Sequence, residues 1–149
     1  MYEARIIDKA IDINEVVREV IEYSYKKGGG ALAIFIGYVK GVVDNKNVHE
    51  LKYTAYQPYA TKKLIDIVKE ESQDSDIICV KVFHRIGNLL PGEPSVYVFV
   101  SAITREKAFE KAKTILERIK HEVPIYKLEK REDGEFWVMG DRTRIKRKE

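Results

Sequence analysis

The stretch from Thr104 to Trp137 constrains the fold most, because a helix pattern, a stop and a hairpin signal follow one another there. Apolar residues recur at steps of three and four along its first part, which predicts one buried face of a helix. These residues are Ala108, Phe109, Ala112, Ile115, Leu116 and Ile119. Pro124 cannot continue the helix and disfavours helical backbone at the residue before it. Glu132-Asp133-Gly134 then predicts a tight turn between strands 125–130 and 135–138.

Two lysines flank this proline stop, Lys120 in or near the last helical turn and Lys127 in the extended segment after it. A sharp break between them can direct both side chains toward one cleft, with Arg105 at the other end of the helix. Two amines and a guanidinium suit an anionic substrate, or a nucleophilic amine that nearby positive charge keeps partly neutral. Spacing alone favours a plainer alternative, in which Lys120 complements the helix dipole and Lys127 is an exposed strand residue.

The rest of the chain alternates between predicted strands and helices. Strands are predicted at 2–7, 31–39, 49–56, 77–84 and 95–103, and helices from Asp12 to Lys27 and from Pro58 to Ser72. Segment 41–47 reads as a loop, and strand 49–56 is predicted to pair with strand 31–39. Because hairpins accompany the alternation, we predict a mixed α+β fold with a mixed or antiparallel sheet.

Composition excludes several classes of protein. A chain of 149 residues with 44% hydrophobic and 34% charged side chains is expected to form one soluble, globular domain. No apolar run is long enough for a membrane span and no signal peptide opens the chain, so a cytoplasmic location without membrane association is predicted. The single cysteine, Cys79, excludes an internal disulfide and is expected to be a buried, inert thiol.

The net charge of +3 is concentrated at the C-terminus. Residues 142–149 hold five basic side chains and one acidic, a net of +4, which leaves −1 for the rest of the chain. A nucleic-acid binder needs basic charge spread over a folded face, so that function is disfavoured. We therefore predict a single domain over residues 1–141 and a basic, flexible tail at 142–149, whose deletion leaves the domain intact.

Metal and serine-nucleophile chemistry lack their usual signatures. No Cys-x-x-Cys or His-x-x-x-His spacing occurs, and no Gly-x-Ser-x-Gly elbow is present. His84 or His121 could serve as a general base, although a hydrogen-bonded structural role is the more common one for each. No metal site is predicted.

Six motifs together resemble one protein family, the large catalytic subunit of molybdopterin synthase (the MoaE family). In chain order they are Gly30-Ala31 with Phe35-Ile36-Gly37-Tyr38-Val39-Lys40, Leu51 to Tyr56, His84-Arg85-Ile86-Gly87 with Gly92-Glu93, Thr104 to Phe109, Lys120 with Pro124-Ile125-Tyr126-Lys127, and Asp133-Gly134 with Trp137. The resemblance covers roughly Tyr2 to Trp137 and leaves the basic tail outside.

The resemblance implies a sulfur-transfer enzyme of molybdenum cofactor biosynthesis. Sulfur would pass from the thiocarboxylated Gly-Gly terminus of a small ubiquitin-like (MoaD-like) carrier subunit to cyclic pyranopterin monophosphate (precursor Z), making the dithiolene of molybdopterin. It also implies an α/β hammerhead fold with an additional β-rich part, and a homodimer of this chain with a carrier at each end. No cofactor is required by this chemistry.

The family's functional residues fall on particular positions of this chain. The resemblance implies Lys120 and Lys127 as the catalytic pair, and Arg105, Lys40, Phe35, Thr104 and Arg142 as substrate-binding residues. Thr104 stands where the family usually has histidine, and Lys40 where it usually has arginine. The family's arginine after the tryptophan has no counterpart in register, because Asp141 stands there and Arg142 follows one residue later. The missing histidine keeps open an alternative, a non-catalytic paralogue that acts as a binding scaffold for the carrier subunit.

Overall fold

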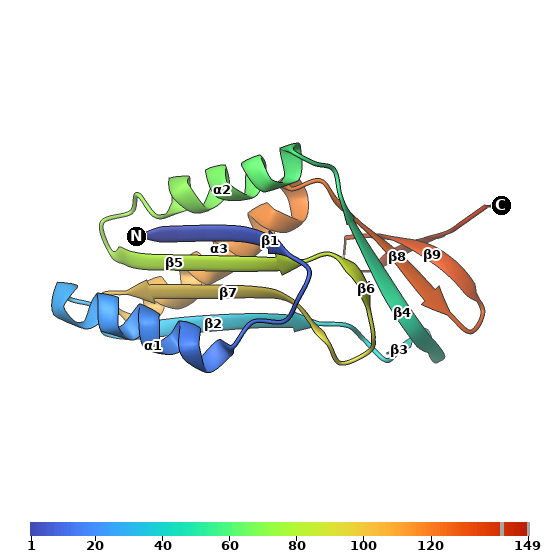
Figure 1. The fold of residues 1–149 in the computed structure, drawn as a ribbon, viewed down its shortest axis with the longest axis horizontal. Coiled ribbons are helices and arrows are strands. Elements are labelled where there is room, and N and C mark those ends of the chain that lie inside the picture. Colours follow the sequence, from blue (N-terminus) through green and yellow to red (C-terminus); the bar gives the residue numbers. More distant parts are fainter. Residues whose placement is uncertain (141, 149) are drawn as a thin grey trace.

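Two β-sheets joined along the long axis of the molecule form the framework (Figure 1). The computed structural model describes residues 1–140 and 142–148. Within these ranges the helices lie on the first sheet, and the second sheet ends near the C-terminus (Figure 1). The fold is mixed α+β, as the sequence predicts.

The first sheet has mixed strand directions. Its strands, in spatial order, are β1 (Tyr2–Ile7), β5 (Ile77–Arg85), β7 (Pro94–Ala102) and β2 (Ala31–Tyr38). β1 runs parallel to β5, whereas the β5–β7 and β7–β2 pairs are antiparallel. The central strands β5 and β7 are buried almost throughout, which explains their nearly continuous apolar sequences.

Helices cover both faces of this sheet. α2 (Tyr59–Glu71) and α3 (Arg105–Glu122) pack on one face, and α1 (Ile13–Ser24), continued by a 3-10 turn at Tyr25–Lys27, packs on the other. Alternate residues of β7 enter the two cores: Val98 packs with α2 and α3, whereas Phe99 packs with α1. The apolar face of α3 is confirmed except at Phe109, which is 68% exposed.

The second sheet is the additional β-rich part. In spatial order it contains β10 (Thr143–Lys146), β9 (Gly134–Met139), β8 (Ile125–Arg131), β4 (Lys46–Ala55) and β3 (Val42–Val43), and β6 (Gly87–Leu89) also pairs with β4. Every pairing in it is antiparallel. A small core centred on Val39, Leu51 and Leu89 packs beneath it.

Three local expectations differ from the structure. β4 does not pair with β2, which pairs with β7 at the edge of the first sheet, but lies in the second sheet beside β8, β6 and β3. Segment 41–47 is a tight hairpin whose turn residues, Asp44 and Asn45, both have positive φ. Residues Thr143–Lys146 form strand β10, paired with β9, where a flexible tail was expected. The domain boundary placed at Asp141 lies outside the described residues and stays a prediction.

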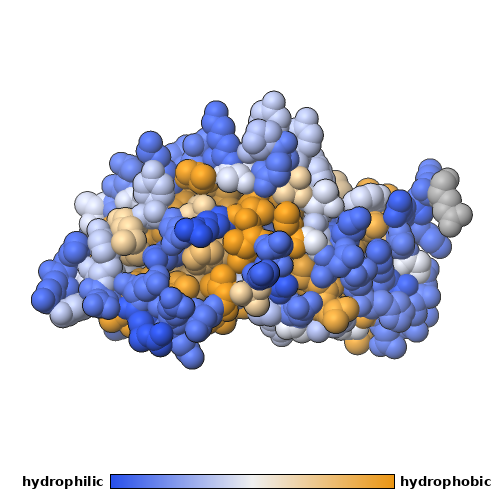
Figure 2. Space-filling model, viewed as in Figure 1, coloured by the Kyte–Doolittle hydropathy of each residue, from blue (hydrophilic) through white to orange (hydrophobic). Residues whose placement is uncertain are grey.

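The surface changes character along the molecule. Figure 2 shows apolar side chains in orange near the middle of one face, between hydrophilic surface over α1 and hydrophilic surface over the second sheet. In the described part of the chain no helix is long and apolar enough to cross a membrane.

Candidate active site

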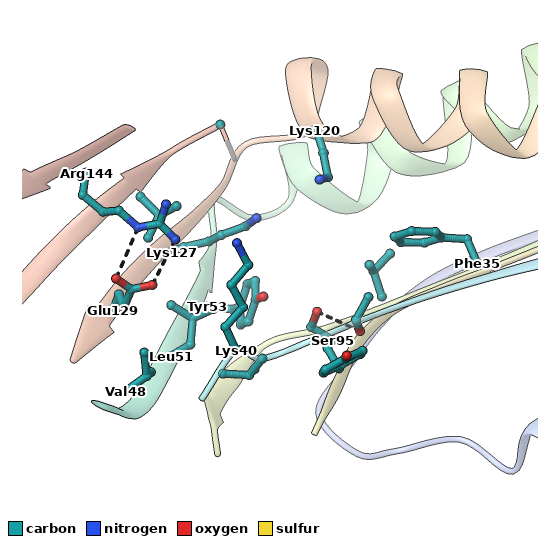
Figure 3. A pocket seen from close by; sticks show the side chains of 16 residues that line it. Phe35, Lys40, Val48, Leu51, Tyr53, Ser95, Lys120, Lys127, Glu129 and Arg144 are labelled. Atoms are coloured by element: carbon teal, nitrogen blue, oxygen red, sulfur yellow. Dashed lines mark hydrogen bonds and ion pairs between the residues drawn. The ribbon is translucent and has the colours of Figure 1, made fainter. Parts of the chain in front are cut away.

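A pocket of about 250 Å³ lies where the two sheets meet, below the C-terminal end of α3 (Figure 3). We call it the lysine pocket. Both sheets and α3 contribute to its wall. Its lining includes Phe35, Lys40, Tyr53, Ser95, Lys120, Lys127, Glu129 and Arg144.

Lys120 and Lys127 both line the pocket, although the chain between them leaves a helix and enters a strand. The helix ends at Val123, whose backbone is extended (φ −87°, ψ 123°), as expected for a residue before proline. Pro124 follows, and β8 carries Lys127 back along β4. In Figure 3 the Lys120 side chain points down from the helix into the space that Lys127 enters from the sheet. The proline break therefore brings the two amines to one pocket.

Phe35, within β2, and Lys40, in the segment after that strand, line the same pocket. Arg105 and Thr104 do not line it, because they lie at the opposite end of α3, about 22 Å along the helix from Lys120. Thr104 is the N-cap of that helix, and its hydroxyl oxygen accepts the backbone N–H of Lys107 at 3.3 Å.

Two charged residues that sequence reasoning missed belong to the pocket, Glu129 on β8 and Arg144 on β10. The Arg144 guanidinium donates to both carboxylate oxygens of Glu129, at 3.3 Å and 3.2 Å. Glu129 is almost fully buried, and Arg131 lies 3.7 Å from it on the same strand. Arg142, the predicted arginine, is exposed and is not among the lining residues. Only the pairing of β10 with β9, which no sequence signal revealed, brings Arg144 to the site.

A smaller chamber of about 90 Å³ continues beneath the lysines and shares Tyr53, Ser95, Lys120 and Lys127 with the pocket. His84 forms part of its wall and is almost fully buried, edge-on to the Tyr53 ring with centroids 5.4 Å apart. Its Nδ1 lies 2.8 Å from the carbonyl oxygen of Arg85, so the neutral ring carries its proton on that nitrogen. His84 and Tyr53 thus form a polar part of the wall of this inner chamber.

Burial sets the charge states of His84 and Tyr53. Desolvation lowers the pKa of His84 to about 4, and the positive charge of Lys127 adds to the effect, while the bond to the Arg85 carbonyl opposes it. Desolvation also raises the pKa of Tyr53, against a smaller opposite effect of its hydrogen bond with Ser95. Both side chains are therefore neutral at pH 7.

The pocket suits an anion better than a metal ion. Its charged lining consists of Lys40, Lys120, Lys127 and Arg144 against the single carboxylate of Glu129. Among residues 1–140 and 142–148, no three histidine, cysteine or acidic side chains gather into a metal-binding group. Phosphate or carboxylate groups are the ligands that such a set of cations attracts most strongly.

Known proteins share this architecture. The family model described as MoaE protein matches residues 6–122. The molybdopterin synthase catalytic subunit of Pyrococcus abyssi is 35% identical over 92% of this chain and 91% of its own length. That of Bacillus subtilis is 38% identical over 80% and 76%.

Solved structures agree. The molybdopterin synthase of Staphylococcus aureus superposes with a TM-score of 0.77 and 32% identity, over 89% of this chain and 94% of that one. A protein–protein complex of subunits 1 and 2 of the molybdopterin-converting factor from Helicobacter pylori gives a TM-score of 0.70 and 25% identity, over 98% and 90%. Sequence and structure thus converge on one result: this chain belongs to the MoaE protein family.

Proposed function

We propose that this chain is the catalytic subunit of a molybdopterin synthase and works in the cytoplasm. It transfers sulfur from the thiocarboxylated C-terminus of a small ubiquitin-like carrier to cyclic pyranopterin monophosphate, and so makes the dithiolene of molybdopterin. The observation that carries the proposal is the convergence of Lys120 and Lys127 with two further cations on one pocket.

The phosphate of the substrate binds to Lys40 and Arg144 in this proposal. Both line the side of the pocket formed by the second sheet and the end of β2, and both can donate charge-assisted hydrogen bonds. Arg144 is held by Glu129, which fixes the direction of its guanidinium fork. Phe35 offers a flat apolar surface on the other side for the pterin ring (Figure 3).

Lys120 acts as the nucleophile or general base, and Lys127 assists it. A lysine performs either task only as a neutral amine, and the end of a helix holds its backbone firmly. Lys127 interacts with the Tyr53 ring, with its amine 5.8 Å from the ring centroid, and binds the carboxylate that remains on the carrier after sulfur has left. Because a dithiolene contains two sulfur atoms and each thiocarboxylate supplies one, each product molecule consumes two carriers.

Arg105 and Thr104 enter the proposal through a second copy of the chain. They lie about 22 Å along α3 from Lys120, so a contribution to catalysis requires that they reach the lysine pocket of a partner. We therefore propose a homodimer whose pockets are completed across the interface. The Helicobacter pylori relative, a complex of two different subunits, supports a small protein partner in addition.

A reconstituted reaction tests the proposal. The protein is mixed with a thiocarboxylated carrier and the pterin precursor, and dithiolene product is measured with the ordinary carboxylate form of the carrier as control. Product with the thiocarboxylate alone, at one molecule per two carriers, is the expected result. Tight carrier binding without any product would instead favour the scaffold function.

A further inference from the structure

The turn Leu90–Glu93, between β6 and β7, is closed by its own last residue. The Glu93 backbone N–H donates to the Leu90 carbonyl at 3.0 Å, and the Glu93 carboxylate accepts the Leu90 N–H at 2.6 Å. Gly92 has φ +86°, in the left-handed region that favours glycine after a proline such as Pro91. The Glu93 carboxylate therefore stabilises the turn beside Gly92, where the backbone of the turn is most constrained.

This turn holds the residue before Lys40. The backbone N–H of Val39 donates to the Glu93 carbonyl at 3.0 Å, and the Gly92 N–H donates to the Val39 carbonyl at 2.8 Å. Lys40 itself lies in neither a helix nor a strand. On its other side, the Gly41 carbonyl accepts the N–H of Val48 at 2.9 Å. The backbone that carries the pocket lysine is thus set largely by the turn.

Arg85 fixes the turn to the first sheet. Its side chain is only 10% exposed, and its guanidinium lies 3.6 Å from the second carboxylate oxygen of Glu93. It also donates to the Pro94 carbonyl at 3.1 Å, while its Nε is buried with no hydrogen-bond partner in the described part of the chain. The nearby negative charge of Glu93 therefore stabilises a guanidinium that is incompletely satisfied.

We propose that Glu93 is a positioning residue for Lys40. Through Leu90 and Arg85 it locks the turn, and the locked turn holds the Val39 backbone so that the Lys40 amine stays within the lysine pocket. A lysine on an unsupported segment would spread over many positions and contribute less to binding an anion. The inference rests on the proposed function, in which Lys40 binds the phosphate group.

A double-mutant cycle tests whether Glu93 acts through Lys40. The measurement is the Kd for inorganic phosphate by titration calorimetry, together with KM and kcat in the reconstituted reaction. Glu93→Ala is expected to raise the Kd and the KM about fivefold while kcat changes less than about twofold. In the Lys40→Ala background, Glu93→Ala is expected to add nothing. Glu93→Gln keeps the size of the side chain and the bond from Leu90, and is expected to show a smaller loss of the same kind.

Glu135→Ala is the matched control. Glu135 is as exposed as Glu93, at 39%, and also pairs with an arginine, Arg147, but it does not line the lysine pocket. Glu135→Ala is expected to leave the Kd for phosphate and the KM unchanged. Equal losses from Glu93→Ala with and without Lys40, or no loss at all, would show that the inference is wrong. If Glu93 and Lys40 are coupled in the Kd for phosphate but no dithiolene forms, the proposed reaction is wrong and the inference about Glu93 still holds, since the phosphate measurement needs no turnover.

Discussion

At the scale of single residues, the two lysines that we propose as catalytic, Lys120 and Lys127, are held differently. Lys120 lies in the last turn of α3, whereas Lys127 projects from β8 and contacts the Tyr53 ring. We expect Lys120→Ala to abolish turnover with little change in carrier binding, and Lys127→Ala to be milder and to weaken binding in part. Lys120→Arg is expected to fail as well, because a guanidinium stays protonated and can neither attack nor accept a proton.

Single-turnover product formation with saturating thiocarboxylated carrier is the measurement for these lysine variants. Lys113, an exposed lysine of the same helix, provides the control substitution. Its change to alanine is expected to leave the rate unaltered. If Lys120→Arg keeps most of the rate, Lys120 serves only as an anion-binding charge.

His84 predicts a dependence of stability on pH. Its pKa is about 4 in the folded protein and near 6.5 in an unfolded chain, so the unfolded state binds more protons between these values. The free energy of unfolding therefore falls as the pH is lowered from 6.5 to 4, by up to about 3 kcal/mol from this residue. Denaturant titrations at pH 7 and pH 4.5 measure the difference.

A substitution isolates this effect from the titration of carboxylates. His84→Asn can retain a donor for the Arg85 carbonyl but does not gain a proton in this range. We expect it to lose stability at pH 7 yet to show a smaller drop between pH 7 and pH 4.5. The same change at exposed His121 controls for the loss of an imidazole as such. An unchanged drop in His84→Asn would show that this residue does not titrate as described.

At the scale of secondary structure, local signals predicted the elements well and their pairing poorly. Pro124 and the N-cap Asp12, whose carboxylate accepts the Glu15 N–H at 3.3 Å, mark helix ends through forces within a few residues. The pairing of β4 with β8 joins residues far apart in the sequence, from Ala55 with Ile125 to Val48 with Arg131. Strand propensity depends on such neighbours and does not identify them. Sequence reasoning therefore placed β4 beside the wrong strand.

β10 shows the same limit with a functional consequence. Its composition is that of a solvated tail, and only its ladder with β9 reveals that Arg144 reaches Glu129. Deletion of residues 142–149 is expected to lower the free energy of unfolding by about 2 kcal/mol, because the buried Glu129 carboxylate loses its hydrogen bonds from Arg144 and keeps only the longer contact with Arg131. Phosphate affinity is expected to fall as well. Denaturant unfolding and calorimetry measure the two effects.

The control for this deletion keeps the strand but removes a surface pair. Arg147→Ala breaks the exposed contact with Glu135 and is expected to cost less than about 0.5 kcal/mol. Arg144→Met leaves residues 142–149 in place and removes only the guanidinium that pairs with Glu129. It is expected to reproduce most of the effect of the deletion. If the deletion variant has the same free energy of unfolding as the full-length chain, residues 142–149 do not stabilise the domain and this prediction is wrong.

At the scale of the whole molecule, the site is a product of the junction between two sheets. Lys40 follows a strand of the first sheet, Lys127 and Arg144 come from the second, and Lys120 comes from the C-terminal end of α3, which packs on the first sheet. The proline break alone showed only that Lys120 and Lys127 could face one cleft, and spacing favoured the plainer alternative; the family resemblance singled out the pair. Sequence reasoning placed Arg105 with them within one chain, and the length of α3 shows that this grouping does not occur.

A second copy of the chain offers the way for Arg105 to act, and mixed dimers test it. Arg105→Ala and Lys120→Ala are each expected to be nearly inactive alone. In a purified heterodimer of the two, one pocket carries both lesions and the other none, so about half of the wild-type rate is expected. A heterodimer of Lys120→Ala with Lys120→Arg is the control, and it is expected to stay inactive because each copy supplies the Lys120 of its own pocket and both substitutions are expected to fail. A chain that light scattering finds monomeric at micromolar concentration, or a first heterodimer as inactive as its control, would leave Arg105 outside the reaction.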